Sequence, residues 1–287
     1  LILNLVHPFP RPLNIFVNVA LIFMVLMHGM QMALLKSTLP KDGPQMLAKA
    51  GEENAGLMDI GEGKACVFKI ESHNHPTLIN PFDGAATGVG GVLRDIFGMG
   101  AKNLGVGASL RYGPKAEKNS KDLLSGAMEG AASYCGAMEI PLIDLDLYYE
   151  NSFQHNCLMN VSALGVVKND ELIPNIVPKN AAGYNLIYVG KPTAGAAVGG
   201  ASFASQAFEA GKTKEIEFGS NPRLEKATFD AFKKVKDALK KKKLLSQMSL
   251  KDMGAAGLTC STAEQVSGRG YGIEILTDKV PVPAGLK

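Results

Sequence analysis

The sequence has no tryptophan and only four cysteines. The cysteines lie far apart and form no CxxC pair (Cys66, Cys135, Cys157, Cys260). This spacing argues against a zinc ribbon and against a disulfide framework. Reduced thiols in a cytoplasmic enzyme fit the pattern better.

Large excesses of charge are also missing. The formal net charge is +3, which is too small to indicate a nucleic-acid partner by itself. Hydrophobic residues make up 46% and charged residues 20% of the 287 positions, which excludes wholesale disorder and is typical of a folded α/β protein. The length allows two domains of ordinary size.

Acidic residues are absent from Leu1 to Lys41. Within that segment Ile15 to Met27 is apolar except for Asn18, but these 13 residues are fewer than the roughly 20 that span a bilayer. A signal peptide is an alternative, although no small-residue cleavage site follows the apolar run. We expect residues 1–41 to be an aberrant or incomplete N-terminal segment, and no membrane as a partner.

Apolar periodicity then predicts alternating strands and helices, with a loop and one short helix over residues 42–64. The expected strands are 65–70, 104–110, 158–167 and 184–189, and the expected helices are 92–99 and 121–136. Alternation of this kind is typical of an α/β layer structure. Residues 168–183 hold two prolines and several polar residues, so we place a domain boundary there.

The clearest helix signal begins at Asn221, which can cap a helix whose first residue is Pro222. Its lysines, from Lys233 to Lys243, have no interleaved aromatic residues, and we interpret them as a solvated face rather than a nucleic-acid patch. A turn, a short helix and a strand are expected between Asp252 and Ile275.

Four short segments concentrate polar residues and glycines. The first is KIESHNHP, in which an extended backbone would place Lys69, Glu71, His73 and His75 on one side, with Pro76 ending the row at a sheet edge. A hydrogen-bonded surface strand is the plain alternative. A zinc site at His73 and His75 is less favoured because no further soft ligand stands nearby.

The second segment is GAATGVGG, followed by VLRD. Glycines allow backbone N–H groups to surround an anion, and a helix starting near Gly90 would point its positive end at a phosphate. Arg94 can bind a phosphate bidentately, and Asp95 offers a hard oxygen to Mg²⁺. The alternative is a close-packed turn with a surface ion pair.

The remaining two segments are GGASFAS, over residues 199–205, and DMGAAGLT, which starts at Asp252. The former is either a phosphate-binding nest or tight helix–sheet packing. The latter places an acid before a small-residue turn, which suits phosphate binding through a metal.

Together the segments KIESHNHP, PFDGAATGVGGVLRDIFGMGA, GGASFAS and DMGAAGLTCSTAE resemble, in order and spacing, the synthetase part of the phosphoribosylformylglycinamidine synthase family over about residues 40–287. The resemblance implies the fold of aminoimidazole ribonucleotide synthetase: an N-terminal domain at 42–170, followed by an incomplete C-terminal α/β domain at 181–287. It implies a cytoplasmic ligase of purine biosynthesis, in which ATP and ammonia convert formylglycinamide ribonucleotide to formylglycinamidine ribonucleotide.

Site residues also follow from the resemblance, and their types suit the chemistry. It implies ATP at Lys69, Mg²⁺ at Glu71, a second Mg²⁺ at Asp95 and Asp252, substrate along Ser72, His73, Asn74, His75 and Arg94, and His73 as the proton acceptor. The implied partners are a glutaminase subunit or domain that supplies ammonia and the second half of the synthetase. Neither a nucleic acid nor a membrane is expected.

The sequence departs from the family pattern at two places. A tryptophan-containing motif that ends in Ser-Glu-His-Cys precedes this region in the family, and here only His28 stands near its place, so we assign His28 no role. A substrate-binding glutamine aligns with Glu217, which leaves substrate binding by the second domain open. We therefore expect a partial copy without synthetase activity of its own. A nucleotide-binding or degenerate fragment and another ATP enzyme of the superfamily are the alternatives.

Overall fold

The structure, a computed structural model, describes residues 2–6, 37–38, 43–49, 51–193, 220–254 and 257–283. Its largest element is a five-stranded sheet with the order β2-β3-β6-β4-β5. The strands are β2 (Gly56–Gly61), β3 (Lys64–Ser72), β4 (Lys102–Tyr112), β5 (Leu142–Tyr149) and β6 (Leu158–Lys168). β4 and β5 run parallel, whereas the other neighbouring strands run antiparallel.

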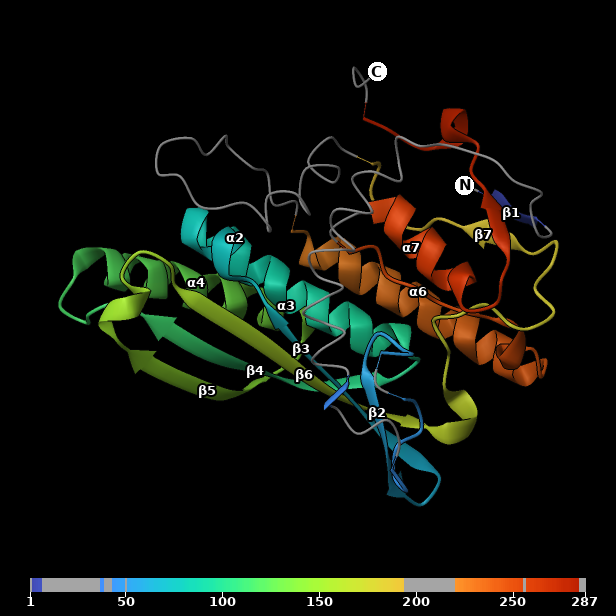
Figure 1. The fold of residues 1–287 in the computed structure, drawn as a ribbon, viewed down its shortest axis with the longest axis horizontal. Helices are drawn as coiled ribbons and strands as arrows, with labels where there is room; N and C mark the ends of the chain where they lie inside the picture. Colours follow the sequence, from blue (N-terminus) through green and yellow to red (C-terminus); the bar gives the residue numbers. More distant parts are fainter. Residues whose placement is uncertain are drawn as a thin grey trace.

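Three helices cover one face of this sheet, as Figure 1 shows: α2 (Asn74–Ile79), α3 (Pro81–Gly98) and α4 (Lys118–Met138). The core between the two layers is formed by residues with alternating burial along β3, β4 and β6, among them Val67, Leu110 and Val161, which have no exposed surface. This arrangement confirms the α/β architecture that the sequence predicts.

Helix α3 begins nine residues earlier than expected, at Pro81 rather than near Gly90. Asn80 caps it by accepting a hydrogen bond from the Asp83 N–H at 3.1 Å. The glycines of GAATGVGG therefore lie inside a helix and not in a phosphate-binding loop, so that prediction was wrong. Their lack of side chains serves close packing: a Cβ atom on Gly84 would lie 2.4 Å from the backbone of α2.

The end of β3 also differs from the expectation. The strand stops at Ser72, His73 is the residue before α2, and His75 and Pro76 lie within α2. His75 is therefore not part of an extended row with Lys69 and Glu71. Pro76 does not mark a sheet edge either, because β3 lies between β2 and β6.

The loop expected over residues 42–64 contains a strand. Its second half forms β2 and the start of β3, and Met46 forms an isolated bridge with Met58. β5, which pairs in parallel with β4, was also not predicted.

A second, smaller group of elements follows the main sheet. It contains a three-stranded antiparallel sheet with the order β7-β1-β8, formed by β7 (Asn185–Ile187), β1 (Ile2–Val6) and β8 (Gly272–Glu274). It also contains the helices α6 (Pro222–Lys241) and α7 (Gly257–Ser267). A small buried cluster of Val177, Ala181 and Val266 is separate from the main core, whose last member is Val167. The domain boundary at 168–183 stays a prediction.

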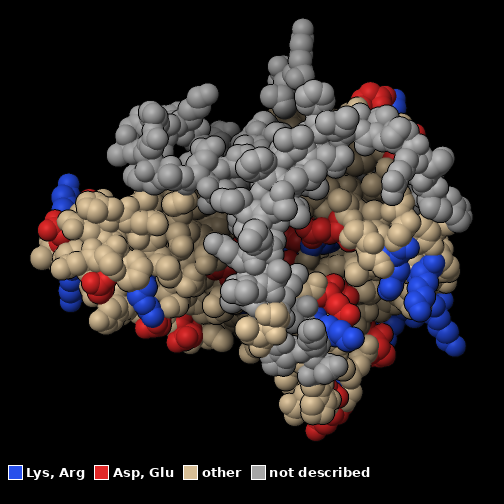
Figure 2. Space-filling model, viewed as in Figure 1, with Lys and Arg blue, Asp and Glu red and all other residues tan. Residues whose placement is uncertain are grey.

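Helix α6 joins the two groups of elements. Asn221 caps it through the Leu224 N–H at 3.0 Å, as the sequence predicts. Its Phe229 ring stacks on Phe97 of α3 with centroids 3.9 Å apart. The lysines of its second half are largely exposed, and Figure 2 shows basic side chains gathered at that end of the molecule. Lys236 is an exception to the predicted solvated face, because its ammonium lies 2.9 Å from Glu171.

No helix in the part of the chain that the structure describes is long and apolar enough to cross a membrane. The apolar run from Ile15 to Met27 lies outside that part. The four cysteines are free thiols.

Candidate functional site

The charged row of β3 continues a buried apolar row. Ala65 and Val67 point toward α3 and are fully buried, and because alternate residues of a strand share a face, Lys69 and Glu71 point the same way. Glu71 fits there because Gly91 has no side chain: a Cβ atom at that position would lie 3.0 Å from Glu71 Oε2.

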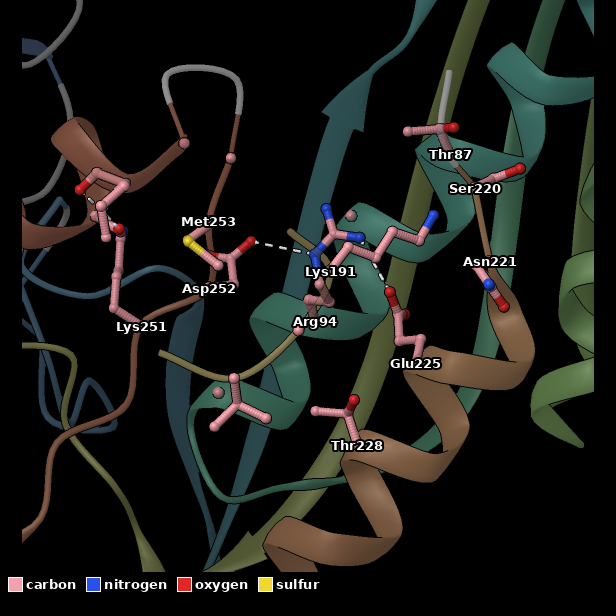
Figure 3. A pocket seen from close by; sticks show the side chains of 18 of the residues that line it. Thr87, Arg94, Lys191, Ser220, Asn221, Glu225, Thr228, Lys251, Asp252 and Met253 are labelled. Atoms are coloured by element: carbon pink, nitrogen blue, oxygen red, sulfur yellow. Dashed lines mark hydrogen bonds and ion pairs between the residues drawn. The ribbon is translucent and has the colours of Figure 1, made fainter. Parts of the chain in front are cut away.

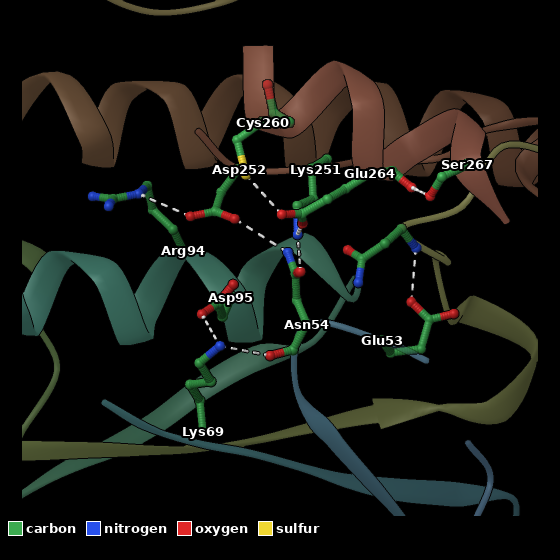
Figure 4. A network of polar contacts seen from close by, with 12 residues as sticks. Glu53, Asn54, Lys69, Arg94, Asp95, Lys251, Asp252, Cys260, Glu264 and Ser267 are labelled. Carbon is green, nitrogen blue, oxygen red and sulfur yellow. Dashed lines mark hydrogen bonds and ion pairs between the residues drawn. The ribbon is translucent and has the colours of Figure 1, made fainter. Parts of the chain in front are cut away.

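Lys69 links β3 to α3 and to the loop before β2. Its ammonium lies 2.8 Å from Asp95 Oδ2 and donates to the Asn54 carbonyl at 2.8 Å (Figure 4). Burial disfavours the charge of Lys69, but Asp95 outweighs this effect and raises the pKa of Lys69. Asp95 and Arg94 each have ionic partners on another element, and these ion pairs are part-buried rather than at the surface that the alternative reading gave them.

Arg94 is held between two carboxylates. Its Nη1 lies 3.0 Å from Glu225 Oε2 on α6, and its Nε lies 3.5 Å from Asp252 Oδ2 (Figure 3). Burial disfavours the charged guanidinium, yet Glu225 and Asp252 together keep the pKa of Arg94 above its ordinary value. The cation is thus fixed in place by acids that lie 131 and 158 positions away in the sequence.

A polar network continues behind Asp252, as Figure 4 shows. Asn54 Nδ2 donates to Asp252 Oδ1 at 3.1 Å, and Asn54 Oδ1 accepts from Lys251. Lys251 also forms an ion pair with Glu264 of α7, to which Cys260 donates at 2.7 Å. The loop before β2, the segment 251–254 and α7 are therefore held together around Asp252.

The carboxylates of this region carry more negative charge than the nearby cations balance. The pKa of Asp95 is raised to about 7, mainly by burial and next by the charge of Asp252, against the opposing effect of Lys69. Burial also raises the pKa of Glu71, and Asp252 adds to that shift. Burial and neighbouring acids disfavour the charged form of these carboxylates, and a bound cation would offset that cost.

These carboxylates fit Mg²⁺ as ligands that share the metal with a phosphate. No group of three or more His, Cys, Asp or Glu side chains within metal-binding distance occurs among the described residues. Mg²⁺ does not require one, because it keeps several waters and commonly takes one or two carboxylates together with substrate phosphates. Glu71, Asp95 and Asp252 interact electrostatically, so they can serve such an ion.

A cavity of about 1100 Å³ opens beside Arg94. It lies between α3, the first half of α6 and the segments 186–193 and 250–254 (Figure 3). The predicted site residues that line it are Glu71, Ser72, His73, Asn74, His75, Arg94 and Asp252. The opposite wall is apolar and includes Phe97, Phe229 and Phe232. A polar end and an apolar wall are typical of a small-molecule site.

Four residues that line the cavity each have a buried polar atom without a hydrogen-bond partner in the described part of the chain. These atoms are His73 Nδ1, Thr87 Oγ1, Glu225 Oε1 and Arg94 Nε, the last of which is only ion-paired, at 3.5 Å, with Asp252. Burial lowers the pKa of His73, so its imidazole is mainly uncharged at neutral pH. An unsatisfied buried polar atom costs about 1–3 kcal/mol, which a polar ligand in the cavity would offset.

Two of the predicted substrate-binding side chains have other partners. Asn74 Oδ1 accepts a hydrogen bond from the Met159 N–H at 2.7 Å, which attaches α2 to β6. Ser72 Oγ donates to Asn160 Oδ1 at 2.7 Å. Glu217 and the segment 199–205 lie outside the described residues.

A second cavity, of about 710 Å³, lies on the other side of the network. Lys69 lines it together with Asn54, Lys251 and Glu264. Of the predicted residues, the structure thus places Lys69 at this second cavity and the substrate residues at the first, with Asp95 buried between β3 and α3.

Sequence reasoning did not find Glu225, Thr87 or Asn54. Glu225 stands in the first turn of a helix whose charges we interpreted as solvated, and Thr87 stands inside the glycine-rich segment. No local pattern connects these residues with Arg94 or Asp252, since their contacts join segments far apart in the chain.

Comparison with known proteins gives two family matches. Residues 52–167 match the family of AIR synthase related proteins, N-terminal domain. Residues 1–42 match a different family, described as a protein of unknown function (DUF1145). The second match ends at residue 42, one residue after the end of the N-terminal segment 1–41 that the sequence predicts.

Similar proteins include the phosphoribosylformylglycinamidine synthase subunits PurL of Prochlorococcus marinus (strain MIT 9313) and Nostoc sp. (strain PCC 7120). They are 40% identical over 250 residues and 41% identical over 248 residues, which cover 86% and 85% of this chain. The chain spans about 30% of the length of these curated relatives.

Solved structures of T. maritima PurL have the same fold. The one complexed with FGAR is 29% identical with a TM-score of 0.67, over 88% of this chain and 38% of that one. The one complexed with ATP is 27% identical with a TM-score of 0.65, over 96% of this chain and 41% of that one.

Proposed function

We propose that this relative of the PurL subunits of phosphoribosylformylglycinamidine synthase carries part of an ATP-dependent ligase site. The reaction would convert formylglycinamide ribonucleotide, ammonia and ATP into formylglycinamidine ribonucleotide, ADP and phosphate. The observation that supports the proposal is the cavity beside Arg94, where His73, Thr87 and Glu225 present buried polar atoms without partners in the described residues. Because the chain spans about 30% of its relatives, the whole activity would need the second half of a synthetase.

The proposed chemistry has two steps. The amide oxygen of the substrate attacks the terminal phosphorus of ATP, so that a P–O bond to the amide forms and the bond to ADP breaks. Ammonia then adds to the activated carbon, and phosphate leaves. Arg94, held by Glu225 and Asp252, would orient the anionic substrate, since a fixed guanidinium binds anionic groups without reorganising.

His73 is proposed as the proton acceptor for the attacking ammonia. Burial lowers the pKa of His73, and its Nδ1 has no partner among the described residues, so a neutral imidazole faces the cavity. A neutral imidazole can take the proton that nitrogen loses as the C–N bond forms.

Lys69 and the carboxylates are proposed to serve ATP. Two of the three N–H donors of Lys69 go to Asp95 and the Asn54 carbonyl, which leaves one for a phosphate oxygen. Glu71 would hold one Mg²⁺ and Asp95 with Asp252 a second; each ion, when bound, would neutralise charge on the phosphates. The ammonia would come from a glutaminase subunit or domain.

The face of the main sheet opposite the helices supports a second synthetase half as partner. Phe68 and Leu164 lie opposite each other on β3 and β6 with 45% and 38% of their surface exposed, and Ile70 is 67% exposed. An exposed apolar patch of this kind is typical of a protein interface.

We propose that the sheet of the second synthetase half covers this patch. Phe68→Glu should then lower co-purification of a separately produced second half of a curated relative, and unchanged co-purification would contradict this assignment.

Isothermal titration tests the nucleotide site. Wild type should bind Mg-ATP, and Glu71→Ala and Asp95→Ala should each weaken binding by at least about tenfold, because either change removes a metal ligand. Asp122→Ala is the matched control, since Asp122 is an exposed acid of α4 that pairs with Lys118. Absence of Mg-ATP binding by wild type, or equal effects of all three changes, would refute the proposal.

A further inference from the structure

Glu225 makes contacts that a residue serving only helix packing would not need. Its Oε2 accepts the hydrogen bond from Arg94 Nη1 at 3.0 Å, and its side chain is 11% exposed. Glu225 lines the cavity, and its buried Oε1 has no hydrogen-bond partner in the described residues. Figure 3 shows the side chain reaching from α6 toward Arg94 at the polar end of the cavity.

Tyr134 of α4 also interacts with the Glu225 side chain. Its hydroxyl interacts with Glu225, and burial raises the pKa of Tyr134, so the group remains a donor. This approach requires Gly90, since a Cβ atom there would lie 2.5 Å from the Tyr134 hydroxyl. Three elements, α3, α4 and α6, therefore fix the position of one carboxylate.

The surrounding charge determines which part of a ligand can face Glu225. Arg94 already pairs with two acids at this end of the cavity, Glu225 and Asp252. A phosphate placed against Glu225 would add a third negative charge, which like-charge repulsion disfavours. A neutral N–H or O–H donor fits instead, because Oε1 is an acceptor without a donor.

Packing alone does not account for the residue. The stacked rings of Phe97 and Phe229 already join α6 to α3 one helical turn further on, and an ion pair between Lys226 and Glu139 joins α6 to the end of α4. A carboxylate that only attached the helix would not retain an unsatisfied oxygen on a cavity wall, where the desolvation penalty is about 1–3 kcal/mol.

We propose that Glu225 is a substrate-binding and positioning residue: one carboxylate oxygen fixes the guanidinium of Arg94, and the other accepts a hydrogen bond from a hydroxyl or amide N–H on the neutral part of the substrate. The ligand class is a phosphorylated glycosyl amide, whose anionic group goes to Arg94. This inference rests on the proposed function and adds a residue that binds the neutral part of the substrate.

Titration with two probes tests it: formylglycinamide ribonucleotide, which has ribose hydroxyls and amide N–H groups, and inorganic phosphate, which lacks them. Glu225→Gln keeps the shape but replaces an acceptor with a donor. It should weaken ribonucleotide binding by about tenfold or more, while phosphate affinity should not fall, since a negative charge near Arg94 is removed. Glu139→Gln, which breaks the exposed ion pair with Lys226, is the control and should leave both affinities unchanged.

The outcomes separate the two proposals. Wild type that fails to bind the ribonucleotide contradicts the proposed function and this inference with it. Wild type that binds, with the same ratio of the two affinities in Glu225→Gln, overturns the inference alone and indicates a packing role. If Glu225→Gln does not fold, Glu225→Asp is the second variant, because it keeps the charge but withdraws the carboxylate by one methylene. It should lower the ratio of ribonucleotide affinity to phosphate affinity.

Discussion

Gly84 offers a direct test of how α2 is positioned over α3. A Cβ atom on Gly84 would lie 2.4 Å from Pro76 C and from Thr77 N, whereas carbon contacts are optimal at about 3.5–4.0 Å. Both atoms belong to the backbone, so the helix α2 must move as a whole. Overpacking of this kind costs about 1–3 kcal/mol, and the higher helix propensity of alanine offsets about 1 kcal/mol. We expect Gly84→Ala to lower the free energy of unfolding by up to about 2 kcal/mol.

Gly98, in the last turn of the same helix, is the matched control. A Cβ atom there would meet nothing within 4 Å, and Gly98 is not among the glycines with positive φ. Gly98→Ala should therefore raise the free energy of unfolding by about 0.5–1 kcal/mol. Urea unfolding gives both values if the m-value stays constant. Equal stability of the two variants would refute the packing argument.

The same change bears on function. The Thr77 N–H and hydroxyl both donate to the His73 carbonyl, at 3.3 and 2.6 Å. A shift of α2 therefore moves His73, and Gly84→Ala should weaken ribonucleotide binding at temperatures where the variant is still folded. Gly136→Ala, on α4 and outside the cavity lining, should bind as wild type does.

Two further predictions concern charge. Because the pKa of Asp95 is about 7 in the folded chain and lower when unfolded, the folded state keeps a proton that the unfolded state has lost between about pH 4 and 7. The free energy of unfolding should thus fall by up to about 4 kcal/mol as pH rises through this window, and Asp95→Asn should flatten the profile; a flat wild-type profile would contradict the assignment. Lys236 donates to the Gly100 carbonyl at 2.6 Å and pairs with Glu171 at 2.9 Å, so Lys236→Met should lower the free energy of unfolding by about 1–2 kcal/mol in urea unfolding. Lys234→Met, at an exposed position, should change it by less than about 0.5 kcal/mol, and equal effects would argue against this contact.

Much of the fold follows from local patterns. The strands around Val67, Leu110 and Val161 were predicted because alternate or continuous apolar residues make buried strands recognisable. Helix α6 was predicted from its cap at Asn221, which the structure confirms. Such features depend on neighbours in the sequence.

The conformation of the segments that were predicted wrongly depends on contacts with elements that are distant in the sequence. The glycines of α3 are poor helix formers, yet they lie in a helix because α2, β3 and α4 approach closely there; at Gly84 and Gly90 a Cβ atom would collide with other elements. β5 was not predicted, although apolar and acidic residues alternate from Ile143 to Leu147; it is an edge strand with most of its residues exposed.

The site residues also fall into two groups: those that the sequence motifs predict and one that only the three-dimensional structure reveals. The motifs placed Lys69, Glu71, Arg94 and Asp252 in one region, and the structure brings them together around the two cavities. Their roles toward ligands stay predictions. Glu225, which fixes Arg94 from another helix, could be found only once α6 was placed against α3.

The central claim is that the cavity between α3 and α6 is a ligand site, and a crystal structure of the chain soaked with formylglycinamide ribonucleotide tests it most directly. We predict that the ligand occupies this cavity, with its anionic group on Arg94, a donor on Glu225 Oε1 and the imidazole of His73 facing the amide. An unoccupied cavity with the ligand bound elsewhere, or a ligand in the cavity that contacts neither Arg94 nor Glu225, would contradict the account.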